Sequence, residues 1–140
     1  MRYVLDTDVI VAALRSPTDA SAALLRAALE GRFTLLASVP LIIEYEATCS
    51  RADHRRAAGL SEAEVRQFLD AVAALAEPVE THFLWRPRLR DPEDEMVLDA
   101  AVNGQAHAIV TFNLRDFGTT PQEFGIAVLK PREALFRLLQ

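Results

Sequence analysis

The sequence predicts an α/β fold in which a central parallel β-sheet is flanked by α-helices on both faces. Two observations lead to this prediction. Short, continuous apolar runs rich in β-prone residues alternate with longer stretches of helical periodicity, and polar side chains follow several of these runs directly. Such runs suit strands that are buried on both faces of a parallel sheet. The chain has 140 residues, of which 51% are hydrophobic and 25% charged, so we expect one globular domain over residues 1–140.

The first strand is expected at the start of the chain, where Tyr3-Val4-Leu5 precedes Asp6-Thr7-Asp8. Ligands of parallel sheets bind outside the carboxyl ends of the strands, which is where Asp6 falls. An apolar helical stretch over residues 9–14 follows. Taken alone, each aspartate has a simpler interpretation: Asp6 as a solvated strand end and Asp8 as a helix N-cap.

The other elements follow from helix caps, glycine and proline positions and short apolar runs. Helices are predicted over residues 20–30, 38–51 and 52–59, from the capping box at Ser61 until Pro78, over residues 91–104, and from Pro131 onward. Strands are predicted over residues 33–37, 108–110 and 126–129, with a further short strand within residues 79–85. Residues 112–118 are predicted to form a turn or a short helix.

Polar oxygen-bearing side chains recur where a predicted strand ends or a helix begins. They are Asp6, Glu44, Asp94, Glu95, Thr111, Asn113 and Asp116. All such points lie along one edge of a parallel sheet, so these side chains are expected to converge. Oxygen ligands favour hard cations such as Mg²⁺ or Mn²⁺, whereas zinc prefers His and Cys. A site of this kind positions a phosphodiester and activates a water.

Single acids have ordinary explanations. Asp94 and Glu95 suit the positive end of a helix dipole, and Asp91 suits a turn before Pro92. The metal-site hypothesis therefore depends on their occurring together with Asp6 and Glu44, since a cluster of ligands carries more information than a lone carboxylate.

The same residues carry a resemblance to the PIN-domain family, in particular to the toxin components of toxin–antitoxin systems. The segments VLDTDV (residues 4–9), LIIEY (41–45), RDPEDE (90–95) and IVTFN (109–113) occur in the order typical of that family. The resemblance implies a Mg²⁺- or Mn²⁺-dependent ribonuclease. It implies Asp6, Glu44 and Asp94 as the principal catalytic and metal-binding carboxylates, Asp116 and Asn113 as a less constant contribution, and Thr111 as support. It also implies an RNA substrate, a cognate antitoxin and a homodimer.

Two positions depart from the family pattern. Asp8 stands where the family usually has Asn or Ser, and Asn113 stands where this branch usually has Asp. One charge is gained and one is lost, which leaves the number of bound metals open. Asp8 and Glu95 are therefore treated as supporting residues. The departures also leave open a PIN-like nucleic-acid-binding module whose catalysis is weakened.

A second enzyme class shares the Asp-x-Asp pattern. Haloacid-dehalogenase phosphatases use the first aspartate of such a motif, here Asp6, as a covalent nucleophile, and Ser38 could act as their phosphate-binding hydroxyl. Against this class, Val9 stands where Gly-Thr usually follows, the only lysine (Lys130) lies just before the last helix, and the chain is short for that fold with its cap.

The charge distribution bears on the substrate. A net charge of −5 disfavours nucleic acid unless the acids are gathered around cations, which reverses the local field. A basic loop with Arg86, Arg88 and Arg90 beside Trp85 suits phosphate binding and stacking, or it is simply solvated. A second basic cluster, Arg51, Arg55 and Arg56, is explained equally by substrate contact, by antitoxin contact or by solubility.

The remaining composition suggests the compartment. The single cysteine, Cys49, is expected to be a buried thiol, which fits a reducing environment. No apolar run is long enough to span a membrane, and no signal peptide is recognised before the first strand. We therefore expect a cytoplasmic protein without a membrane partner.

Overall fold

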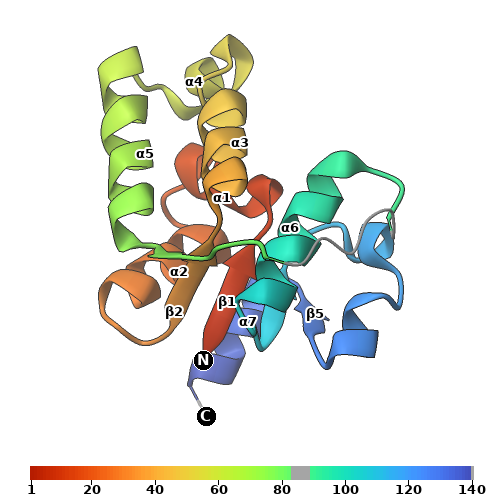
Figure 1. Ribbon diagram of the computed structural model, residues 1–140. Helices are drawn as coiled ribbons and strands as arrows, with labels where there is room; N and C mark the ends of the chain where they lie inside the picture. Colours follow the sequence, from red (N-terminus) through yellow and green to blue (C-terminus); the bar gives the residue numbers. More distant parts are fainter. Residues whose placement is uncertain (83–88, 140) are drawn as a thin grey trace.

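A five-stranded parallel sheet runs through the computed structural model, which describes residues 1–82 and 89–139 (Figure 1). Its strands are β1 (Arg2–Leu5), β2 (Thr34–Ala37), β3 (Glu77–Pro78), β4 (Ala108–Val110) and β5 (Ala127–Leu129). They lie in the order β3-β2-β1-β4-β5, and every pair of neighbours is parallel. The predicted α/β fold class is confirmed.

Helices cover both faces of this sheet (Figure 1). They are α1 (Thr7–Arg15), α2 (Ala20–Leu29), α3 (Val39–Cys49), α4 (Ala52–Ala58), α5 (Glu62–Leu75), α6 (Pro92–Asn103) and α7 (Pro131–Leu138), with short 3₁₀ helices η1 (Leu114–Phe117) and η2 (Pro121–Phe124). Helix α6 packs on β1, β2 and β4 and against α3, while α2 packs against both α1 and α7. No helix in the described residues has the length and apolar character needed to cross a membrane.

The strand order puts β1 at the centre, between β2 and β4. The chain passes from β1 to β2 and then to β3 on one side, and it later returns to β4 and β5 on the other side. The crevice between β1 and β4 is thus the point where the winding of the sheet changes direction. Ligands of open α/β sheets bind at such a point, outside the carboxyl ends of the strands.

Backbone hydrogen bonds continue across this edge of the sheet. The N–H of Asp6 donates to the carbonyl of Val110 over 2.9 Å, and the N–H of Thr111 donates to the carbonyl of Leu129 over 2.9 Å. Asp6, Thr111 and Lys130 therefore follow three neighbouring strands in a row. This arrangement places the predicted site residues of β1 and β4 side by side.

The strands are buried, as their continuous apolar runs predict. Tyr3, Val4 and Leu5 of β1 and Ile109 of β4 have no exposed surface. The hydroxyl of Tyr45 donates to the carbonyl of Leu5, so that α3 is tied to the end of β1. This contact holds the helix that carries Glu44 beside the carboxyl edge of the sheet.

Besides shifts of a residue or two at element ends, three features differ from the sequence prediction. The sequence predicts a short strand within residues 79–85. For the described residues of this range the prediction is wrong: the strand β3 lies earlier, at Glu77–Pro78, because α5 already ends at Leu75. Pro78 is accommodated because β3 is an edge strand, where a missing N–H is tolerated. Helix α1 begins at Thr7 rather than at residue 9, and η2 was not predicted. The turn or short helix after β4 is confirmed as η1.

Gly104 is required for close packing between α6 and the sheet. A Cβ atom there would lie 2.8 Å from the carbonyl oxygen of Ala100, 2.9 Å from Val79 and 3.1 Å from Leu36. We expect Gly104→Ala to lower the free energy of unfolding by about 1–3 kcal/mol, the usual cost of overpacking, as measured by urea denaturation. Gly59→Ala is the control, since its Cβ meets open space and only its positive φ of 70° is strained. An equal or smaller loss for Gly104→Ala would contradict the steric account.

Candidate active site

Asp6 is the link between β1 and α1. As the N-cap of α1 it accepts a hydrogen bond at Oδ1 from the N–H of Thr7 over 2.8 Å, and at Oδ2 from the hydroxyl of Thr111 over 2.8 Å. Only 9% of the residue is exposed. The interpretation of Asp6 as a solvated strand end is therefore wrong. The carboxylate is held from two sides, in the crevice between β1 and β4.

Asp8 anchors the loop that follows β4. Its Oδ2 accepts hydrogen bonds from the N–H of Phe112 over 3.0 Å and from the side-chain amide of Asn113 over 3.1 Å, and a longer one of 3.4 Å from the hydroxyl of Thr111. Its Oδ1 is buried without a hydrogen-bond partner among the described residues. Asp8 is therefore not the N-cap of α1, because Asp6 takes that position.

Asp94 reaches the same place from the first turn of α6. This helix begins with Asp91 as N-cap, which accepts from the N–H of Glu93 over 2.9 Å, and Pro92 at its first position. Asp94 is 8% exposed. Burial, together with the negative charges of Asp6, Asp116 and other neighbours, raises the pKa of Asp94 to about 7. Asp94 is thus within electrostatic reach of Asp6 and Asp116.

Asp6 and Asp8 show the same crowding of charge. Burial, opposed by hydrogen bonds and reinforced by Asp116 and Asp91, raises the pKa of Asp6. Burial and the charge of Asp6 raise the pKa of Asp8 to about 6. A set of carboxylates that repel one another in a buried crevice has an excess of negative charge, which a bound cation would neutralise.

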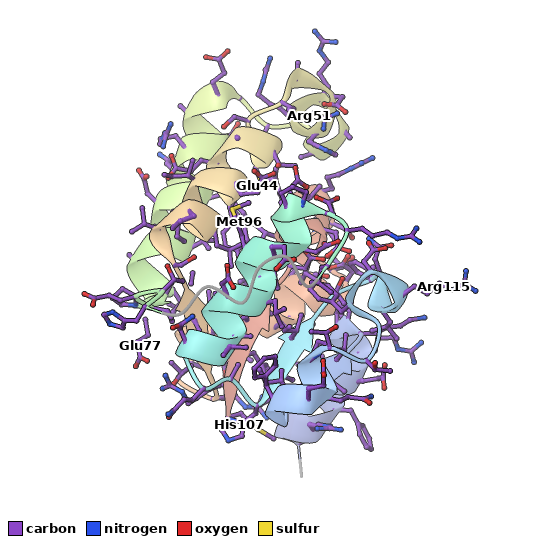
Figure 2. The ribbon with its side chains drawn as sticks, turned by 45° about the vertical axis from the view of Figure 1, so that its right-hand side comes forward. Glu44, Arg51, Glu77, Met96, His107 and Arg115 are labelled. Carbon is purple, nitrogen blue, oxygen red and sulfur yellow. The ribbon has the colours of Figure 1, made fainter. Side chains whose placement is uncertain are left out.

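Glu44 lies on α3, beside the beginning of α6 (Figure 2). It is half-buried, and its Oε1 accepts a hydrogen bond from the hydroxyl of Thr48 over 3.0 Å. Burial and then the nearby Glu44 and Asp91 raise the pKa of Glu93. Glu93 and Asp91 therefore belong to the acidic cluster, although the sequence analysis did not select them. Their membership of the acidic run from Asp91 to Glu95 was the available signal.

The other predicted residues are placed unequally. Asp116 is exposed in η1, and Asn113 is exposed with its backbone N–H donating to the hydroxyl of Thr111 over 3.0 Å. Glu95 is buried and accepts a hydrogen bond from the N–H of Leu89, so it anchors the chain that leads into α6. Glu95 therefore stabilises the chain segment before α6.

The basic clusters are only partly described. Arg86, Arg88 and Trp85 lie outside the described residues, while Arg90 is exposed next to the N-cap of α6. Arg51 forms an ion pair with Asp53 over 3.1 Å at the start of α4. The charge of Arg51 is thus paired with that of a neighbouring residue, which gives no support to a phosphate contact by Arg51.

The donor set suits a hard divalent cation. No three His, Cys, Asp or Glu side chains of the described residues enclose a metal ion as they stand. However, the clustered groups are carboxylates, their mutual repulsion raises pKa values, and Asp8 has a buried oxygen without a partner among the described residues. Oxygen donors with uncompensated charge match Mg²⁺ or Mn²⁺. Cys49 is fully buried and its thiol pKa is raised to about 12, which excludes it as a nucleophile at neutral pH.

Thr111 connects the two halves of the site, because its hydroxyl donates to Asp6 and accepts from Asn113. We expect Thr111→Val to lower the free energy of unfolding by about 1–3 kcal/mol, because a buried carboxylate loses its donor, as measured by urea denaturation. Thr111→Ser keeps the hydroxyl and should stay closer to the unmodified protein. A loss in Thr111→Ser with none in Thr111→Val would show that Thr111 contributes the packing of its methyl group, which valine retains, and not the hydrogen bond.

Known proteins share this sequence pattern and this fold. Residues 2–115 match the PIN domain family. A structure of VapBC2 from Rickettsia felis bound to a DNA fragment from their promoter has a similar fold, with a TM-score of 0.63 and 16% identity over 92% of this chain and 98% of that chain. No curated protein sequence matches. The family match confirms the resemblance carried by the four segments and removes the haloacid-dehalogenase alternative. This chain belongs to the PIN-domain family of nucleases.

Proposed function

We propose that this protein is a metal-dependent endoribonuclease and the toxin of a toxin–antitoxin pair. One observation supports the nuclease most directly: Asp6 and Asp94 are buried together at the point where the sheet reverses its winding, with Asp116 close enough to raise the pKa of each. An accumulation of buried carboxylates with perturbed pKa values is typical of a catalytic or metal site. Membership of a nuclease family gives that site its class of reaction.

The site residues have distinct roles in this proposal. Asp6, Glu44 and Asp94 would hold Mg²⁺ or Mn²⁺, with Asp116 and Asn113 assisting. When bound, the cation supplies an activated water and stabilises the oxygen that leaves the phosphodiester. Thr111 holds the Asp6 carboxylate in one orientation, and Asp8 holds the loop from which Asn113 projects. With a pKa raised to about 7, Asp94 is only partly ionised at neutral pH, so cation binding should release protons.

The fold and the family support a proposal for the biological setting. The similar structure from Rickettsia felis contains VapBC2 bound to promoter DNA. By analogy, we propose that a cognate antitoxin binds this chain and holds it inactive, and that the toxin acts on RNA in the cytoplasm as a homodimer. A small gene that overlaps this one, and co-purification of its product with this chain, would support the pairing.

The decisive experiment is cleavage of RNA by the purified chain, freed of any partner. Structured and single-stranded RNA are incubated with Mg²⁺, with Mn²⁺ and with EDTA, and the ends of the products are identified. We expect cleavage with either metal, none with EDTA, and 5′-phosphate ends. Absence of cleavage, in a protein shown by a thermal shift to bind the metal, would contradict the nuclease proposal.

The alternative is a binding module whose catalysis is weakened, and it depends on the two departures from the family pattern. The geometry favours catalysis, because the departures compensate each other: the amide of Asn113 donates to the extra carboxylate of Asp8 over 3.1 Å. The negative charge that is absent at Asn113 is therefore carried by Asp8, with which Asn113 is in contact. A module without a metal site would show no increase of Tm with Mn²⁺, whereas a retained site should raise it.

A further inference from the structure

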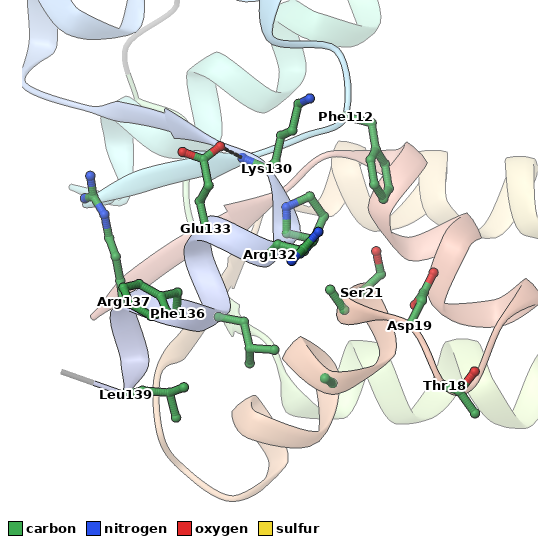
Figure 3. Close-up of a pocket in the computed structure, with 14 residues that line it drawn as sticks. Thr18, Asp19, Ser21, Phe112, Lys130, Arg132, Glu133, Phe136, Arg137 and Leu139 are labelled. Carbon is green, nitrogen blue, oxygen red and sulfur yellow. Dashed lines mark hydrogen bonds between the residues drawn. The ribbon is translucent and has the colours of Figure 1, made fainter.

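A cavity of about 1110 Å³ opens between the amino end of α2 and the length of α7 (Figure 3). Helix α2 contributes Asp19 and Ser21 to its lining, and the segment from the end of β5 into α7 contributes Lys130 and Arg132. Phe112, from the loop after β4, closes one side. None of these residues was selected by the sequence analysis for this cavity, and none belongs to the carboxylate cluster.

The lining is mainly apolar, and its cations outnumber its acids. The cations are Lys130, Arg132 and Arg137, and none forms an ion pair with any carboxylate in the described part of the chain. The two acids, Asp19 and Glu133, accept hydrogen bonds from the backbone N–H groups of Ala22 and Lys130 and keep their charge. The lining thus has an excess of positive charge beside apolar surface, which favours an anionic ligand that also has apolar parts. The hydroxyl of Ser21 in its wall also has no hydrogen-bond partner among the described residues.

The cavity lies next to the candidate active site along the same sheet edge. Asp6, Thr111 and Lys130 directly follow β1, β4 and β5, which are neighbouring strands. Two strand spacings, roughly 10 Å, therefore separate Asp6 from Lys130 along this edge. Phe112 connects the two regions, because its N–H donates to Asp8 while its side chain lines the cavity. An extended polymeric ligand that lay across the carboxylates and ran in this direction would reach the cavity.

We propose that this cavity is a subsite for a nucleotide of single-stranded RNA that flanks the bond to be cut. The inference rests on the proposed function, to which it adds the strandedness of the substrate and the residues that bind it. Phe112 is 45% exposed and presents an aromatic ring on which an unpaired base stacks. Lys130 and Arg132 contact the phosphates on either side. Bases of duplex RNA are already stacked in pairs, so the ring selects single strands.

The test measures binding without cleavage. A fluorescent oligouridylate of about ten nucleotides, within the usual size of single-strand sites, is titrated with the intact chain in EDTA at several salt concentrations. Phe112→Ala should weaken binding about tenfold, the size of a lost base stack. Lys130→Gln and Arg132→Gln should weaken it severalfold, each with a salt slope lower by about 1. Arg32→Gln is the matched control, because Arg32 is exposed at the opposite, amino edge of the sheet, just before β2.

The same variants are then compared in metal-dependent cleavage, which separates the two proposals. An active unmodified chain whose cavity variants bind and cleave like Arg32→Gln overturns the subsite and leaves the nuclease standing. Binding that depends on Phe112, Lys130 and Arg132 in a metal-bound chain that never cleaves RNA keeps the cavity as a binding site for single-stranded RNA, overturns the nuclease and removes the flanking role of the subsite. Variants that keep full RNA binding and lose a co-purifying protein assign the cavity to that protein instead. A chain that binds no oligonucleotide but cleaves RNA overturns the subsite alone, and a metal-bound chain that neither binds nor cleaves overturns both proposals.

Discussion

Replacing Asp94 with asparagine is expected to abolish metal-dependent RNA cleavage while the fold is preserved. The loss in kcat/KM should be about 100-fold or more, since even residues that only support a metal ligand commonly cost 10–100-fold. Asp94→Asn keeps the shape of the side chain and removes its charge. Cleavage of labelled RNA with Mg²⁺ or Mn²⁺ measures the effect, and circular dichroism reports the fold.

The same substitution should make the metal-free protein more stable. Asp94 is buried among Asp6, Asp116 and other acids, so its ionised form is repelled by its neighbours. The asparagine side chain carries no charge, so the Tm without metal should rise by several degrees at about pH 8, where the carboxylate of Asp94 is ionised. The increase of Tm caused by Mn²⁺ should largely disappear.

Asp70→Asn provides the matched control, since it removes one negative charge from an exposed position on α5. Its cleavage rate, its Tm and its response to Mn²⁺ should all stay close to those of the unmodified protein. If Asp94→Asn cleaves as fast as Asp70→Asn, then Asp94 is no part of the catalytic site. A lower Tm for metal-free Asp94→Asn would instead contradict the electrostatic account of the crevice.

The second large effect is a stability that rises on acidification, in the absence of metal. Burial and like charges raise the pKa of Asp94 to about 7 and that of Asp8 to about 6, and they also raise that of Asp6. A raised pKa in the folded state means that folding favours the protonated acid. The stability from these groups is therefore fully present below their unfolded pKa and is lost as the pH rises through the folded pKa values.

The expected measurement is the Tm of the metal-free protein from about pH 5.5 to about pH 8. We expect a fall of roughly 5–10 °C over this range, which corresponds to a few kcal/mol for a domain of this size. Asp94→Asn should flatten the upper part of the curve. With saturating Mn²⁺ the pH dependence of the Tm reverses, because a cation binds the ionised carboxylates. The gain in Tm from Mn²⁺ should therefore be larger at the higher pH. A metal-free Tm that rises towards about pH 8 would contradict the crowding of acids at this site.

Much of the fold and of the candidate site was determined by the sequence by itself. Continuous apolar runs identified β1, β2, β4 and β5 because parallel strands are buried, and helix caps such as Ser61 and Asp91 are local signals. Asp6, Asp94 and Thr111 could be selected because each directly follows a strand or begins a helix. Such positions depend only on neighbours along the chain.

The tertiary structure alone decided which of these positions meet. The strand order places Asp6 beside Thr111, and long-range packing pairs Asp8 with Asn113 and Glu44 with Glu93. Hydrophobic periodicity reports which face of an element is buried, but it carries no information about which distant segment covers that face. The cavity that begins at Phe112 exists for the same reason. It is formed where α7, at the end of the chain, packs against α2 near its beginning.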